Sequence, residues 1–385
     1  TYDLSSGTVK VPLAEGERYD YVIRYSGGED TGTIQSRSDT TISKSYKIEF
    51  DIMTLKPEPN GKMQVLLTGN SVSITASGGS VNIDWGDGST SNEGSHTYTD
   101  GNAFHNVSLD SVEEKNAQVT FGEENIVAFW TVGNTPIGVS MLIEQRKLEY
   151  VSEDVCLNSL DISGFFYSCN KLKEIPKSVF ISNGNSTTLK RYDGFEKGLF
   201  GNCSGLKSIP AGLFDNFKNV EYATTAFENC VTIESVPRGL FDKMEKLVEI
   251  DKDSSGYGNV FGIFTRCSSL KEVPFDIFDK NPIYRFDGTF AYTKLTVGLL
   301  PVSLKKPGAI HKHVYYMCPI EKIIGRTKTP ATIDSQCISS ALKIYVPDSA
   351  IDTYKTATNW SNFADKIVGW SELTEEERQK YGLTI

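Results

Sequence analysis

Apolar residues recur in a fixed order along the second half of this chain. The clearest pair of copies reads FGNCSGLKSIPAGLF from Phe200 and FENCVTIESVPRGLF from Phe227. Each copy has Phe, Cys three residues later, an aliphatic residue, Ile or Val before Pro, and Leu-Phe, with polar residues between them. A unit of this size can bury its apolar face only against neighbouring copies, so the pattern predicts a solenoid.

Further copies share the same order of residues and begin at Phe166, Phe264, Phe290 and Tyr315, with a last worn copy around Cys337. In each copy the aliphatic residue and the following Ile or Val predict a short strand with inward side chains. The Pro ends that strand and starts a helical turn, because its missing N–H is not needed there. Leu-Phe then closes the turn onto the core.

Six of the seven cysteines occupy one place in this repeat or in its worn copies: Cys169, Cys203, Cys230, Cys267, Cys318 and Cys337. Residues at one repeat position stack on each other, so we expect small, buried, reduced side chains rather than disulfides. The chain has no Cys-x-x-Cys with a nearby His, and zinc is therefore unsupported. We expect Cys230→Ser to destabilise the fold by roughly 1–3 kcal/mol, because a hydroxyl would enter an apolar row.

The first part of the chain alternates apolar and polar residues with the strand period of two. Tyr19–Tyr25 and Tyr46–Met53 predict strands within a β-rich segment, residues 1–60, that we assign to no family. Residues 61–150 predict more short strands, including Met63–Leu67, Ser71–Thr75 and Ser80–Asp84.

A glycine-rich turn follows the last of these strands. It reads Asp84-Trp85-Gly86-Asp87-Gly88-Ser89, and His96-Thr97-Tyr98 comes after it. The glycines supply backbone freedom, and both aspartates can accept hydrogen bonds within the turn. These residues resemble the polycystic-kidney-disease (PKD) domain, an immunoglobulin-like β-sandwich. Some members of that family bind calcium, so a calcium site at Asp84 and Asp87 is the alternative to a purely structural turn.

The repeat in turn resembles the BspA-like leucine-rich repeats of bacterial surface proteins, in the variant C-x-x-L-x-x-I-P-x-x-L-F, over about residues 155–370. Leu342–Gly369 resembles the family's terminal segment, a strand, Val-Pro and an amphipathic helix carrying Tyr354 and Trp360. Thr374 and Glu377 predict a capping box for a final short helix.

These observations define the expected architecture. It is β-rich and multidomain, with an N-terminal PKD-like β-sandwich followed by a leucine-rich-repeat solenoid. We expect domains at 1–60, 61–150, 151–342 and 343–385, the last being the cap.

Composition and charge exclude some classes of partner. The 385 residues carry a net charge of -10 without a Lys/Arg cluster, which argues against nucleic acid as a partner. No apolar run reaches the length of a membrane span. The chain begins at Thr1, and we interpret it as a mature or trimmed chain whose targeting segment and any lipid anchor have been removed.

Motifs of catalysis and of cofactor binding are absent from the sequence. It contains no nucleophile elbow, phosphate loop or dinucleotide fingerprint, and we interpret His311-Lys312-His313 as a solvated loop. We therefore expect a non-enzymatic protein without a cofactor. The resemblance implies export to the cell surface or outer membrane and adhesion to an extracellular protein or glycan. The alternative is a carbohydrate-binding accessory protein or a glycan-processing surface enzyme.

The expected binding site comes from length differences between copies. Phe180 to Phe200 takes 20 residues and Phe241 to Phe264 takes 23, whereas Phe214 to Phe227 takes 13. Insertions at one repeat position emerge on one edge of a solenoid, and such edges often bind ligands. We predict a ligand site flanked by Phe195 and Tyr257, with Asp251 and Asp253 as polar partners. The alternative is that the loop lengths have drifted without function.

Overall fold

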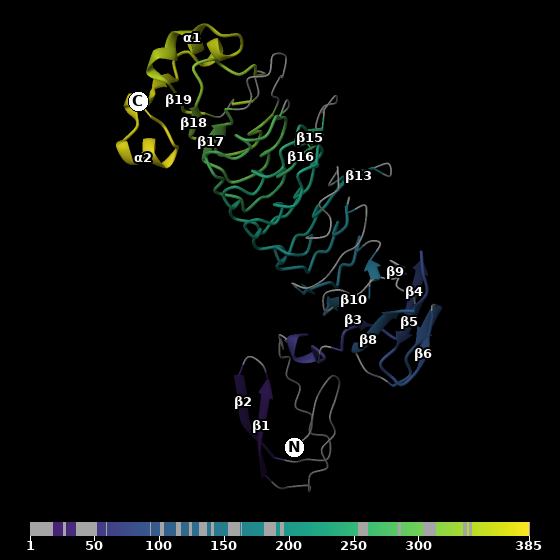
Figure 1. Ribbon diagram of the computed structural model, residues 1–385. Coiled ribbons are helices and arrows are strands. Elements are labelled where there is room, and N and C mark those ends of the chain that lie inside the picture. Colours follow the sequence, from purple (N-terminus) through teal and green to yellow (C-terminus); the bar gives the residue numbers. More distant parts are fainter. Residues whose placement is uncertain are drawn as a thin grey trace. The chain divides into compact units, whose positions relative to one another are not determined.

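The computed structural model describes residues 18–25, 28–35, 52–58, 60–92, 94–100, 104–112, 117–122, 125–130, 137–139, 142–152, 162, 164–180, 190–192, 196–252, 261–283, 286–302, 313–333, 337–338 and 341–384 (Figure 1). The chain divides into two units, Thr1–Lys56 and Pro57–Ile385. The expected boundary near residue 150 stays a prediction.

The first unit contains an antiparallel hairpin of β1(Arg18–Tyr25) and β2(Gly28–Gln35). The strand predicted at Tyr19–Tyr25 is confirmed as β1. Residues 46–51 of the strand predicted at Tyr46–Met53 lie outside the described residues, and its last two residues, Ile52 and Met53, belong to a 3₁₀ turn, η1(Ile52–Leu55). The turn is closed by a 3.2 Å bond from the Lys56 N–H to the Met53 carbonyl, next to Pro57.

The second unit begins with two β-sheets. The six-stranded sheet has the order β12(Tyr150–Val151), β10(Ile126–Phe129), β3(Met63–Thr68), β8(Phe104–Ser111), β5(Val81–Asp84), β6(Thr90–Ser91). The four-stranded sheet has the order β11(Ile137–Val139), β9(Ala117–Phe121), β4(Ser71–Ser77), β7(Gly94–Thr97). Buried residues alternate with more exposed ones along β5 and β8, and inward aliphatic side chains of both sheets share one buried core. The strands predicted around Met63, Ser71 and Ser80 are confirmed as β3, β4 and β5.

Stacked coils follow these sheets, in agreement with the predicted solenoid (Figure 1). Most of each coil consists of turns joined by short extended segments, and regular strands are few. The named strands of this part are β13(Lys190–Tyr192), β14(Glu196–Gly198), β15(Asp251–Lys252), β16(Phe261–Gly262), β17(Val297–Leu300), β18(Lys322–Gly325), β19(Lys343–Val346) and β20(Ile367–Gly369).

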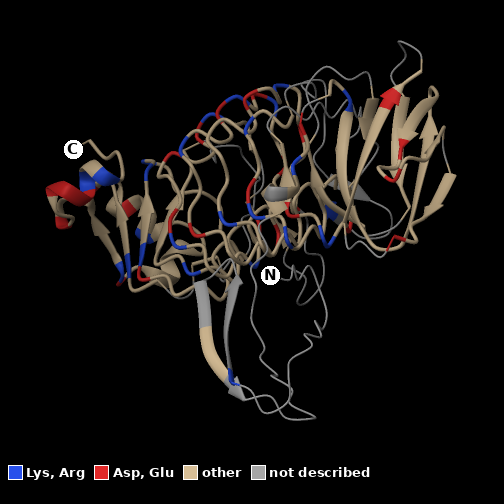
Figure 2. Ribbon diagram, turned by 90° about the horizontal axis from the view of Figure 1, so that it is seen from below, with Lys and Arg blue, Asp and Glu red and all other residues tan. Residues whose placement is uncertain are grey.

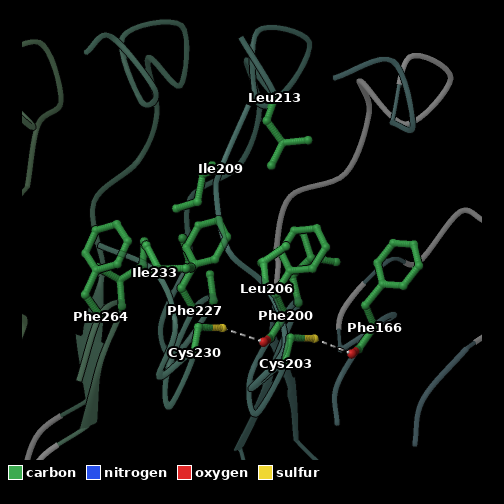
Figure 3. Close-up of a cluster of buried hydrophobic side chains, with 14 of the residues drawn as sticks. Phe166, Phe200, Cys203, Leu206, Ile209, Leu213, Phe227, Cys230, Ile233 and Phe264 are labelled. Atoms are coloured by element: carbon green, nitrogen blue, oxygen red, sulfur yellow. Dashed lines mark hydrogen bonds between the residues drawn. The ribbon is translucent and has the colours of Figure 1, made fainter. Parts of the chain in front are cut away.

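A column of aromatic rings runs through the middle of the coils (Figure 3). Neighbouring rings lie 5.3–5.8 Å apart between centroids and within 11° of parallel, in the order Phe166, Phe200, Phe227, Phe264, Phe290, Tyr315. All of these rings are buried. Because each ring packs on the same ring of the next coil, the returning Phe sets the distance between coils.

One coil begins earlier than the sequence pattern suggested. The backbone N–H of Leu142 donates to the Phe165 carbonyl at 3.1 Å, and that of Glu144 to the Tyr167 carbonyl at 2.6 Å. Leu142 and Gln145 thus occupy the places that Phe and Cys hold in the later copies. This coil adds β12 in parallel to β10, which joins the coils to the six-stranded sheet.

The last coils use longer strands and carry the cap. β17, β18, β19 and β20 form a parallel sheet, and its chain also forms η2(Asp348–Ala350), α1(Ile351–Thr356), η3(Trp360–Phe363), η4(Trp370–Glu372) and α2(Glu375–Lys380). Tyr354 and Trp360 are both buried. The single helix predicted to carry both is shorter than expected, because Tyr354 lies in α1 and Trp360 in the separate 3₁₀ turn η3. The predicted capping box is confirmed: Thr374 accepts from the Glu377 N–H, and Glu377 from the Thr374 N–H.

Candidate ligand-binding edge of the solenoid

The Phe-x-x-Cys segments form one edge of the coils, which we call the turn edge. In five coils the Cys N–H donates to the carbonyl three residues earlier at 3.0–3.2 Å. The residue just before the Cys or its counterpart has φ between 57° and 62°, at Ser168, Asn202, Asn229, Arg266, Tyr292 and Met317. A positive φ at the third residue of a turn strongly favours Gly or Asn.

The cysteine thiols connect successive turns. Each Sγ donates to the carbonyl of the coil before it at 2.9–3.1 Å, in the pairs Cys169–Leu142, Cys203–Phe166, Cys230–Phe200, Cys267–Phe227 and Cys318–Phe290 (Figure 3). All six repeat cysteines are buried and free. Burial raises the pKa of Cys203 and Cys267 to about 12. These are neutral, poorly reactive thiols with a structural hydrogen bond, and the row is therefore not purely apolar.

Two of the earlier coils carry Asn at this positive-φ position, whereas the first two carry Glu144 (φ 58°) and Ser168 (φ 60°). Asn229 Nδ2 donates to Asn202 Oδ1 at 2.8 Å, and Asn202 Nδ2 donates to the Tyr167 hydroxyl at 2.7 Å. Asn tolerates the left-handed conformation well because its short amide can bond locally. The side chains in this part of the edge thus suit the backbone.

Three later coils place larger residues at the same strained position: Arg266, Tyr292 and Met317. The Arg266 guanidinium pairs with Glu228 at 2.8 Å and lies 5.6 Å from the Tyr292 ring centroid. The Tyr292 ring contacts Tyr316 edge-on at 5.6 Å. The Met317 side chain is 68% exposed.

His313 completes this cluster, with its ring 5.3 Å from the Tyr316 ring. The sequence suggested a solvated loop here, whereas the structure half-buries His313 against an aromatic ring. We call Arg266, Tyr292, His313, Tyr316 and Met317 the arginine–tyrosine patch. The signal that could have found it is the change from Asn to Arg, Tyr and Met immediately before Cys267, Thr293 and Cys318.

The two insertions emerge directly before this edge. One is carried by the β13–β14 hairpin and the other by the β15–β16 hairpin. Gly198 and Gly262 end these hairpins, each two residues before the returning Phe. A Cβ at Gly198 would lie 1.8 Å from the Thr225 carbonyl oxygen, and one at Gly262 would lie 2.6 Å from Thr289 Cα. Both hairpins are therefore held at equivalent places, by glycine contacts with the next coil.

Three of the four predicted ligand residues, Phe195, Asp253 and Tyr257, lie outside the described residues. Asp251 is described and fully buried, and its carboxylate accepts the Asp287 N–H. This carboxylate supports the base of the hairpin and faces the interior. The buried Asp251 carboxylate is therefore not accessible to an external ligand, whereas the roles of Phe195, Asp253 and Tyr257 stay predictions.

The Asp84 and Asp87 carboxylates both accept hydrogen bonds from within their own turn. Asp84 accepts the Gly86 N–H at 3.0 Å, and Asp87 accepts the N–H and hydroxyl of Ser89 at 3.0 and 2.6 Å. His96 Nε2 lies 2.7 Å from the other Asp87 oxygen. The Ser89 and His96 hydrogen bonds hold the pKa of Asp87 well below its usual range. Within the described part of the chain, no group of three or more His, Cys, Asp or Glu side chains is arranged to hold a metal ion.

None of the helices in the described ranges is long and apolar enough to cross a bilayer. No family model matches this sequence, and no curated protein matches it either. The interpretation of function therefore depends on the geometry of the chain itself.

Proposed function

We propose that this protein is a non-enzymatic, exported surface protein that binds an extracellular macromolecule through the turn edge of its solenoid. The observation that carries the proposal is the arginine–tyrosine patch. Arg266, Tyr292 and Met317 each occupy a positive-φ position that Asn fills at lower cost in earlier coils. Backbone strain that is kept in three consecutive coils is a reason to infer a function for the side chains at that position.

The composition of the patch supports binding to a protein. Arg, Tyr and Met are enriched at protein interfaces, and Tyr and Arg dominate their binding energy. The Met317 side chain is 68% exposed, Tyr316 precedes it in the same turn, and the Tyr292 ring of the preceding coil contacts the Tyr316 ring. The insertion hairpins lie next to the same edge, so Phe195 and Tyr257 stay predicted contributors.

The proposal includes a family assignment for each of the two parts of the second unit. The repeat motif supports a BspA-like leucine-rich-repeat solenoid, and the Trp85–Ser89 turn with its aspartate bonds supports a PKD-like module. That combination favours a cell-surface adhesin carried outside the cell. Glycan handling is the alternative function, since the half-buried Tyr292 and Tyr316 rings can also stack on sugars.

The test is an array of matrix proteins and glycans probed with the intact chain, followed by variants that separate binding from stability. Tyr292→Asn and Met317→Asn place a residue suited to positive φ at the strained position. We expect both variants to keep or raise the melting temperature while the affinity for the array hit falls at least fivefold. Lys246→Ala, an exposed residue of another part of the coil, is the control for unspecific loss.

A hit whose affinity is unchanged in both variants would contradict binding through the patch. A glycan hit that depends on Tyr292 and Met317 would select the carbohydrate-binding alternative. Turnover of a glycan substrate would overturn the non-enzymatic assignment.

A further inference from the structure

The coils change form between residues 270 and 300, and a groove opens at the change. In the upstream coil, Pro274 ends the strand four residues after Leu270, and the chain turns away. In the next coil the chain stays extended after Leu295 through β17 to Leu300. The Lys294 N–H donates to the Leu270 carbonyl at 2.9 Å, and beyond that point these two fully described segments share no backbone hydrogen bond. The two segments therefore lie side by side at Leu270 and Lys294 and separate beyond these residues.

The groove between them has a volume of about 520 Å³, and α2 forms another of its walls. Its apolar lining includes Val273, Val297, Leu299 and Tyr381. Leu299 and Tyr381 are buried in a small second core, and Val273 and Val297 are partly buried against it. A volume of this size is typical of ligand sites.

The free edge of β17 faces the groove. In its parallel ladder with β18, the Lys322 N–H bonds to the Thr296 carbonyl, so the backbone groups of Val297 and Leu299 point away from β18. The Tyr315 hydroxyl already bonds to both the N–H and the carbonyl of Leu299. Val297 is left as the backbone position at which an added extended segment can bond.

The rim of the groove is more basic than the molecule as a whole. Its charged lining residues are Arg238, Lys271 and Lys380 against Glu272 alone, in a chain of net charge -10. The Arg238 guanidinium lies 4.8 Å over the Phe275 ring and 2.7 Å from Asp276, and its side chain is 67% exposed. Lys271 and its partner Glu234, 3.3 Å away, are both more than half exposed. An exposed ion pair of this kind is weak, so Lys271 can leave Glu234 for a carboxylate of a ligand. Figure 2 shows residues of both signs distributed along the coils.

We propose that this groove is a second binding site, independent of the turn edge, for a short acidic peptide in extended conformation. An aliphatic side chain of the peptide enters the space between Val273, Val297 and Tyr381. The flanking carboxylates meet Lys271, Arg238 and Lys380. The peptide backbone bonds to Val297 at the free edge of β17. Acidic groups are selected because the rim is basic, and an extended chain because the open wall is a strand edge.

The test measures fluorescence anisotropy of a labelled peptide, Gly-Asp-Glu-Leu-Glu-Asp-Gly, with the full chain at low salt. Two control peptides replace Leu by Gly, or all four acidic residues by Lys. We expect saturable binding of the first peptide only, weakening as salt is raised. Lys271→Glu and Lys380→Glu should each lower the affinity about fivefold, as expected for reversing one exposed charge pair. Lys246→Glu, the same change outside the groove, should leave the affinity unchanged.

Val297→Arg fills the groove and should abolish binding, with the melting temperature showing whether the chain still folds. If that variant does not fold, the exposed Lys380→Glu still decides the matter. No saturable binding of the acidic leucine peptide, equal binding of the lysine or glycine peptide, or equal loss in Lys246→Glu would each overturn the proposal.

Discussion

At the scale of single residues, the cysteine row shows how a repeat position gains a second role. The sequence predicted small buried residues, since Cys recurs at one place in the coil. The acceptor of each thiol is a carbonyl 27–40 residues earlier in the chain, as in Cys169–Leu142 and Cys267–Phe227. The sequence could not predict that bond, because it exists only once coil stacking has placed two distant turns in contact.

The raised thiol pKa values predict how stability depends on pH. Burial raises the pKa of Cys203 and Cys267 from the ordinary 9.0 to about 12. The unfolded chain therefore loses these protons first, so their contribution to the unfolding free energy is complete below pH 9 and is lost between pH 9 and 12. We expect a loss of about 1.4 kcal/mol per thiol for each pH unit in that window. Urea titrations under reducing conditions at pH 8, 9 and 10 measure it.

A Cys203→Ala and Cys267→Ala double variant is the matched control and should show a shallower fall above pH 9. An unfolding free energy that is as steep in the double variant as in the parent chain would assign the loss to other groups.

The thiol hydrogen bond also refines the expectation for Cys230. Cys230→Ser keeps a donor for the Phe200 carbonyl, whereas Cys230→Ala removes the donor and leaves a small cavity. We expect Ala to destabilise by about 1–3 kcal/mol and Ser by less. Denaturant unfolding of the two variants compares them. A larger loss for Ser would mean that the apolar surroundings outweigh the carbonyl, as the sequence alone suggested.

At the scale of elements, Gly198 and Gly262 end the two insertion hairpins and allow them to pack closely on the next coil. Gly198 lies so close to the next coil that a methyl group would overlap the Thr225 carbonyl. We expect Gly198→Ala to lower the unfolding free energy by about 2–4 kcal/mol through overpacking. Gly61→Ala measures the cost of backbone strain alone, because Gly61 has a positive φ of 76° and nothing within 4 Å of the new Cβ, whereas Gly198 has no positive φ. An unchanged unfolding free energy in Gly198→Ala would contradict the close contact with the next coil.

Elements with strong local signals were predictable from the sequence, and those defined by distant contacts were not. The capping box at Thr374 needs only residues three apart, and it is present. The coil at Leu142 was missed because Leu and Gln replace Phe and Cys there, so only its hydrogen bonds to the Phe166 coil reveal it. Ile52 and Met53, predicted as the end of a strand, lie in a 3₁₀ turn before Pro57. For the candidate site, three of the four residues predicted from insertion lengths lie outside the described residues, and the positive-φ Arg266, Tyr292 and Met317 could be found only from backbone angles.

The cap helix α2 gives a second prediction at this scale. Lys322 lies 2.6 Å from Glu377, and this pair together with the Thr374 N–H lowers the pKa of Glu377. A lowered carboxyl pKa stabilises the folded state above the ordinary value of 4.5, and the contribution is lost as the pH falls below it. We expect the amide protection factors of Glu375–Lys380 to fall below pH 4.5, and at a higher pH than those of β18. Glu377→Gln should remove this difference, and identical exchange in both chains at every pH would contradict the assignment.

At the scale of the whole second unit, the coils depend on the two-sheet part for a closed end. A solenoid exposes an apolar surface at each end unless a cap covers it. At the C-terminal end, Tyr354 and Trp360 are buried by the terminal segment. At the other end, β12 pairs with β10, the Glu149 N–H bonds to the Val127 carbonyl, and the Ser152 N–H bonds to the Phe129 carbonyl. A single buried cluster runs from Met63 to Ile367.

This continuity makes the separability of residues 61–150 from the coils testable by truncation. A chain of residues 57–385 keeps both caps, whereas a chain of residues 155–385 loses the Leu142 coil and the β10–β12 pairing. We expect the first to unfold in one cooperative transition and the second to aggregate, because the exposed end of the Phe166 coil is apolar and its carbonyls lose their donors from Leu142 and Glu144. Size-exclusion chromatography and denaturant unfolding compare the two. A soluble, monomeric 155–385 chain with the same midpoint would instead show that the coils are an independent domain, and that the sheets preceding them serve a purpose other than closing the solenoid.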